Sequence, residues 1–145
     1  MSAAAGRALY TPGLLALAVE LARYPLDPSL PYRGEARSRS CGSTIDLALA
    51  LDRGALSAIG LRAQACAVGQ AAAAIFAREA VGRSARQLET AEAAIAAWLA
   101  GTGGRPDWPD LAMLEPARDY SARHGAIMLP WRAALAALNK VDAAS

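Results

Sequence analysis

Two cysteines, Cys41 and Cys66, are the residues of this sequence best suited to chemistry, and the chain has no others. Cys41 opens the turn signal Cys41-Gly42-Ser43, and Cys66 stands where an alternating segment gives way to an alanine-rich one. Because each thiol ends a predicted β element, we expect both to share a site at one end of a small sheet. A cysteine at an apolar strand end is also commonly a small buried hydrophobe, and spacing alone leaves both interpretations open.

The place of Cys66 directly before a predicted helix favours its ionised form. Unpaired backbone N–H groups and the helix dipole attract negative charge at that end. The alternation of residues 34–41 also places Arg37 and Arg39 on the same strand face as Cys41, where they would add positive potential. A thiolate of this kind suits a metal ligand, and it equally suits an acceptor of persulfide sulfur.

His124 is the one histidine of the chain, and it falls in a segment predicted to be irregular. A single histidine is more commonly a hydrogen-bonded or surface residue than a ligand, although a loop position favours function. Cys41, Cys66 and His124 together would leave a metal centre one protein ligand short of closed tetrahedral coordination. The candidate site is therefore these three residues, with a fourth position open.

The alternation of apolar and polar residues predicts three strands, over 34–41, 44–51 and 57–65. Asp52-Arg53-Gly54 has the composition of a hairpin turn between the second and third strands. The sheet is therefore an antiparallel meander with one apolar face. The residues expected on that face in the central strand are Ile45, Leu47, Leu49 and Leu51.

Helical spacing and capping signals predict the remaining elements. The signals include Thr11-Pro12 at a helix start and the capping box Ser84 to Gln87. The predicted helices cover 12–23, the segment from Cys66 to about 81, 84–100, a short helix from Pro109 to Pro116, and a last helix that begins at Pro130, with 117–129 irregular. The sequence thus predicts an α+β fold, in which the helices pack on one face of the sheet, as a single domain over residues 1–145.

Composition excludes several classes of function. A chain of 145 residues, 54% of them hydrophobic and with a net charge of +2, can build one core. Its basic residues are scattered without interleaved aromatic residues, so we do not expect it to bind nucleic acid. No apolar run approaches the ~18 residues of a membrane span, and no secretory signal pattern is present, so we expect a cytoplasmic protein with reduced thiols.

The sequence also lacks the usual signatures of an enzyme. The glycines of Gly101-Thr102-Gly103-Gly104 follow a predicted helix rather than a strand, which is the wrong context for a phosphate-binding loop. No serine stands beside the histidine, and no pair of acidic residues has a catalytic setting. We therefore expect a binding protein rather than an enzyme, with a sulfur-transfer role as the one alternative.

Around both thiols the sequence resembles the iron–sulfur cluster scaffold family of IscU, the N-terminal part of NifU, and SufU. The resemblance rests on Cys41-Gly42-Ser43, on the segment 65–72 around Cys66, and on the approach to the first cysteine over 36–40. It extends over roughly residues 8–140. It implies a SufE/NifU-like fold with a first helix, a three-stranded antiparallel sheet and packed helices, in that order.

This chain departs from the family pattern at two of the four ligand positions. Ser43 stands where the family has an aspartate, and Ala126 stands where it has its third cysteine. The histidine that neighbours that cysteine in IscU corresponds to Gly125, so His124 lies one position earlier. Cys41 and Cys66 match the family as expected.

Three functions are compatible with this resemblance. The first is a scaffold or carrier that holds an iron–sulfur cluster or zinc and works with a cysteine desulfurase and cluster-recipient proteins. A partner, a second subunit or a small thiol would then complete the ligands, and a homodimer is one way to do so. The second is a SufU-like, zinc-dependent sulfur acceptor for a cysteine desulfurase. The third is a metal-free module that binds partners on the same fold.

Overall fold

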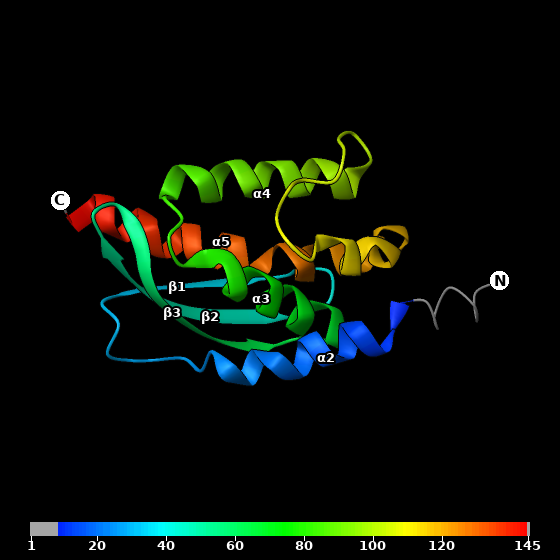
Figure 1. Ribbon diagram of the computed structural model, residues 1–145, viewed down its shortest axis with the longest axis horizontal. Helices are drawn as coiled ribbons and strands as arrows, with labels where there is room; N and C mark the ends of the chain where they lie inside the picture. The colour runs from blue at the N-terminus through cyan, green and yellow to red at the C-terminus, as the bar shows by residue number, and fades with distance from the viewer. Residues whose placement is uncertain (1–8, 145) are drawn as a thin grey trace.

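The computed structural model describes residues 9–144 and has the α+β architecture expected from the sequence (Figure 1). Its three-stranded sheet has the order β1-β2-β3, and both pairs of neighbouring strands are antiparallel. The strands are β1 (Tyr32–Arg37), β2 (Thr44–Asp52) and β3 (Ala55–Gln64). The predicted antiparallel meander is therefore confirmed.

The helices form layers on one face of this sheet (Figure 1). They are α2 (Pro12–Glu20), η1 (Leu21–Arg23), α3 (Ala67–Ala80), α4 (Ala85–Ala100), η2 (Leu111–Asp119) and α5 (Ser121–Ala144). Helices α3 and α5 lie against the strands, α2 packs on α3, and α4 packs on α5. Within residues 9–144, no helix combines the length and the apolar character needed to cross a membrane.

The core lies between the sheet and α3 and α5. Ile45, Leu47 and Leu49 of β2 are fully buried, and Leu61 of β3 pairs with Leu47 on the same face. The four consecutive alanines of α3, residues 71–74, are also fully buried, so this part of the helix presents only short side chains to its neighbours. Because buried apolar area is the main stabilising contribution, this layer holds the fold together.

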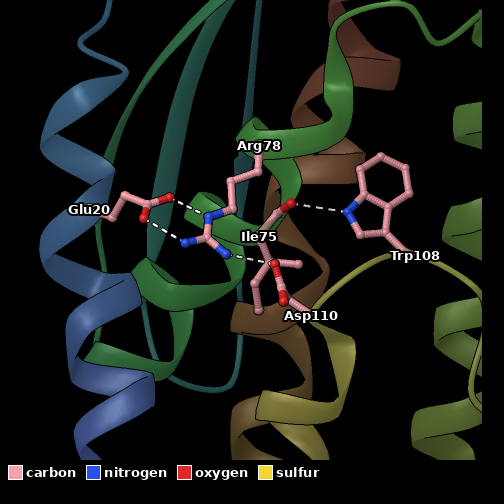
Figure 2. Close-up of polar contacts among 5 residues, drawn as sticks. All are labelled: Glu20, Ile75, Arg78, Trp108 and Asp110. Atoms are coloured by element: carbon pink, nitrogen blue, oxygen red, sulfur yellow. Dashed lines mark hydrogen bonds and ion pairs between the residues drawn. The ribbon is translucent and has the colours of Figure 1, made fainter.

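Arg78 joins three parts of the chain (Figure 2). Its guanidinium pairs with both carboxylate oxygens of Glu20 on α2, and its Nη1 lies 2.6 Å from Oδ2 of Asp110, just before η2. Beside it, Trp108 Nε1 donates a hydrogen bond to the carbonyl of Ile75, at 3.0 Å. Since Arg78 is partly exposed, these ion pairs set geometry more than they add stability.

The prediction of a strand over residues 34–41 is wrong at its end. Strand β1 stops at Arg37, and the next six residues form a tight turn. Ser38 N–H donates to the carbonyl of Ser43 at 2.8 Å, Gly42 N–H donates to the carbonyl of Ser38 at 3.0 Å, and Gly42 takes a φ of 71°. Cys41 therefore lies in a turn, and Arg39 does not share a strand face with it.

The predictions for residues 109–130 also need correction. The predicted short helix is η2, which continues past Pro116, and α5 begins at Ser121 rather than at Pro130. A proline lacks the N–H of one helical hydrogen bond and normally kinks a helix. Here the fully buried residues on either side of it, including Leu129 and Trp131, keep the helix continuous through packing.

We predict that Gly34→Ala destabilises the protein by about 1–3 kcal/mol, the usual cost of overpacking. Gly34 lies on β1 under α5, and a Cβ placed there would lie 2.2 Å from the carbonyl oxygen of Ala133 and 2.5 Å from the amide nitrogen of Ala137. Denaturant unfolding measures the change. Gly104→Ala is the control, because its added methyl meets no atom within 4 Å. Equal stability of the two variants would contradict this close packing.

Candidate functional site

Both thiols lie at the same end of the sheet, as the sequence predicts. Cys41 is in the β1–β2 turn, and Cys66 is the N-cap residue of α3, two residues after the end of β3. The strand register brings these two places together, because Thr44 at the start of β2 pairs with Gln64 at the end of β3. Both cysteines are free and half-buried, so each can react with a partner or ligand at the surface.

Serine hydroxyls surround the Cys41 thiol. Its Sγ lies 3.1 Å from Oγ of Ser43 and 3.4 Å from Oγ of Ser38. Ser38 in turn lies 3.1 Å from the hydroxyl of Ser40, which donates to the carbonyl of Ala122 on α5 at 3.1 Å. Ser38 and Ser43 are buried, whereas Ser40 is exposed. The hydroxyl chain thus joins the thiol turn to the beginning of α5.

The hydroxyls also make the Cys41 thiol easier to ionise. The hydrogen bond with Ser38, followed by that with Ser43, lowers the pKa of Cys41 below the ordinary thiol value. Partial burial opposes this effect, and the charge of Arg123 adds to it. A hydrogen bond that stabilises the charged form lowers the pKa of an acid in this way. Cys41 therefore ionises more readily than an isolated thiol.

Arg123 of α5 lies near both thiols. Its pKa is raised above the ordinary value, first by its Coulombic interaction with Cys66, then by its hydrogen bond to the hydroxyl of Tyr10, and more weakly by Cys41. The sequence suggested Arg37 and Arg39 for this electrostatic role. Arg123 could not be identified from the sequence. Residues 117–129 are predicted there to be irregular, so no pattern places the Arg123 side chain near the thiols.

His124 does not join the two thiols in a metal-binding group. It lies in the first turns of α5, and its Nε2 is 2.8 Å from the carbonyl oxygen of Arg118. It also lines a small pocket against α4, with Leu99 among its neighbours. Within the described residues, no three histidine, cysteine, aspartate or glutamate side chains are grouped so that they could hold a metal ion.

Gly125 and Ala126, at the beginning of α5, are closely packed. A Cβ added at Gly125 would lie 2.4 Å from Oγ of Ser38, and the fully buried Ala126 faces Gly69 of α3. The donor set of the described residues is thus two thiols, which is half the number that a closed zinc site or a [2Fe–2S] cluster requires. These residues do not fit a closed zinc site.

Comparison with solved structures supports the family resemblance. The N-terminal domain of a nitrogen-fixing NifU-like protein from Brucella abortus aligns with a TM-score of 0.87 and 27% identity, covering 95% of this chain and 97% of that one. The chain resembles the NifU-like scaffold family. A protein provisionally assigned as an iron–sulfur cluster assembly scaffold for the SUF system of Fervidobacterium islandicum shares the fold, with a TM-score of 0.78, 15% identity and coverage of 90% and 96%.

Sequence comparison alone does not detect this NifU-like relationship. No protein-family model matches the chain, and no curated protein matches it. The relationship therefore rests on the likeness to solved structures.

We predict that Ser38→Ala slows the alkylation of Cys41 by iodoacetamide at pH 7. Loss of a hydrogen bond to the thiolate raises the pKa of Cys41, so less thiolate is present below that pKa and the rate falls roughly three- to tenfold. The rate is measured by mass spectrometry across a pH series, in a Cys66→Ser background so that only one thiol reacts.

Ser57→Ala, at an exposed position of β3, is the control for this experiment. The turn itself should persist in Ser38→Ala, because its hydrogen bonds use the backbone of Ser38. Identical rate profiles for the two alanine variants would contradict the role of the Ser38 hydroxyl.

Proposed function

We propose that this chain is a scaffold or carrier in iron–sulfur cluster assembly and that Cys41 and Cys66 supply thiolate ligands to a bound cluster. The cluster is its cargo rather than a resident cofactor. The observation that carries the proposal is the arrangement of two thiols at one end of a NifU-like fold, with Arg123 near both. Cysteine thiolates are the usual ligands of such clusters.

The charge of Arg123 suits this function. A cluster bound by thiolates carries net negative charge, and a nearby guanidinium stabilises it electrostatically. The serine hydroxyls around Cys41 provide further hydrogen bonds to a ligating sulfur. Such contacts tune the stability and the reduction potential of a cluster.

The remaining ligands come from outside this chain in the proposal. Two thiols leave two ligand positions of a [2Fe–2S] cluster for a second copy, a partner protein or a small thiol. An incomplete ligand set also favours release of the cargo, because exchange of an external ligand opens the site. The expected partners are a cysteine desulfurase and proteins that receive the cluster.

His124 is a weaker ligand candidate than the two thiols. To bind a cluster beside Cys41 and Cys66, its ring would have to leave the carbonyl of Arg118. We therefore assign it a structural contact at the beginning of α5 and keep its role as a ligand for the test below.

A second candidate function is sulfur acceptance, which the lowered pKa of Cys41 favours. In this reaction the Cys41 thiolate attacks the outer sulfur of a desulfurase persulfide. A new S–S bond forms on Cys41, and the desulfurase cysteine leaves as a thiolate. The two-thiol donor set argues against the zinc-dependent form of this activity. Stimulation of cysteine desulfurase turnover by this chain, lost in Cys41→Ser, would support this second function.

We predict that anaerobic reconstitution with ferrous iron, sulfide and a small thiol yields protein with bound iron and acid-labile sulfide. Cys41→Ser or Cys66→Ser should reduce retained iron at least tenfold after gel filtration, because a serine hydroxyl is a poor ligand for this soft site. Iron and sulfide analysis with an absorption spectrum measures the outcome.

Ser57→Ala is the matched control and should retain iron like the unchanged protein. His124→Ala should retain it too, and a loss comparable to that of the cysteine variants would return His124 to the ligand set. Absence of iron and sulfide from the unchanged protein would overturn the scaffold function and favour a metal-free module that binds partners.

A further inference from the structure

A surface pocket of about 640 Å³, which we call the α4 hollow, lies between α4 and the segment that precedes η2. One wall is a stripe of α4 at helical spacing, from Ser84 through Gln87 and Ala91 to Ala94. The facing wall consists of residues 106–108. A volume of this size is typical of sites for small organic molecules.

Two arginines line this α4 hollow near the N-terminal end of the helix. Arg86 is exposed and makes no hydrogen bond or ion pair with another described residue. Arg83 lies with its guanidinium carbon 4.5 Å from the centroid of the Trp108 ring, and its Nε donates to the carbonyl of Glu79. The lining contains one acidic residue, Asp107.

The backbone of Arg83 is fixed by the hairpin between β2 and β3. Leu56 N–H donates to the carbonyl of Arg83 at 2.9 Å, and Gly82 N–H donates to the carbonyl of Leu56 at 2.8 Å. Trp108 is held by its hydrogen bond to Ile75 and by stacking on Phe76 (Figure 2 shows the hydrogen bond). Arg83 and Trp108 are therefore held in place before a ligand binds, which reduces the cost of binding.

The rest of the lining is largely apolar and small. Ala91, Ala94, Pro106 and the Trp108 ring leave room for a hydrocarbon or aromatic group beyond the two arginines. The N-terminus of α4 is not the anion site here, because the Ser84 and Gln87 side chains already cap it. Positive charge in the α4 hollow comes from the arginine side chains.

We infer that the α4 hollow binds a small organic anion with an apolar body, such as a medium-chain or aromatic carboxylate. The anionic group lies at Arg86 and Arg83, and the apolar body lies along Ala91 and Ala94. Charge complementarity selects an anion, since the lining carries two cations and one carboxylate. This site uses neither cysteine, so it is independent of the proposed function.

The first test uses the fluorescent probe 8-anilinonaphthalene-1-sulfonate, which combines an anionic group with an aromatic body. The unchanged protein should bind one probe per chain with saturation. Decanoate below its micelle concentration should displace the probe, whereas decyltrimethylammonium, a cation with the same chain length, should not. Displacement by the cation as effectively as by the anion would overturn the inference, and so would an absence of saturable binding.

Matched variants locate the bound probe. Ala94→Phe should fill the α4 hollow and reduce probe affinity at least tenfold, whereas Ala93→Phe places the same side chain on the exposed side of the same helix. Arg86→Ala should weaken binding roughly three- to tenfold, compared with Arg33→Ala on β1. Near-ultraviolet circular dichroism checks that each variant is folded.

Equal affinity of the two phenylalanine variants, or of the two alanine variants, would place the probe elsewhere and contradict the inference. A Cys41→Ser, Cys66→Ser double variant should bind the probe like the unchanged protein. Loss of binding in that double variant would also contradict it. Failure of iron reconstitution leaves this inference unaffected, since the two experiments concern different residues.

Discussion

Direct packing of α5 on the sheet is the contact on which the rest of this structure depends. Gly34 of β1 has no side chain, so the α5 backbone at Ala133 and Ala137 can approach the strand. The same helix begins beside the thiol turn, where Gly125 packs on Ser38 and Arg123 lies near both cysteines. The contact that stabilises the core therefore also sets the electrostatics of the candidate site.

The candidate site keeps thiolate chemistry while lacking the donors of a closed metal centre. Ser43 and Ser38 surround the Cys41 sulfur with hydroxyls, and the buried Ala126 packs toward α3. Hydroxyl groups stabilise a thiolate by hydrogen bonds but bind soft metals poorly. The serine hydroxyls therefore support a charged sulfur without completing a set of metal ligands. This arrangement suits a site that holds sulfur or a cluster only with help from outside the chain.

Much of the fold and part of the candidate site could be predicted from the sequence. Alternation in β2 and the capping box at Ser84 are local signals, and the structure confirms both. The beginning of α5 could not be predicted, because Pro130 is locally a helix breaker and only the surrounding core keeps the helix continuous. Because the beginning of α5 was predicted too late in the chain, the position of Arg123 near the thiols could not be predicted either. The α4 hollow is formed by segments distant in sequence and has no local signal.

Native mass spectrometry of anaerobically reconstituted protein tests most directly the claim that this chain supplies two of the ligands of a cluster. We expect a [2Fe–2S] cluster on two chains together, or on one chain with two small thiols attached. Cys66→Ser should remove both species. A cluster on a single chain with no added ligand would contradict the account, because the chain would then hold further ligands of its own.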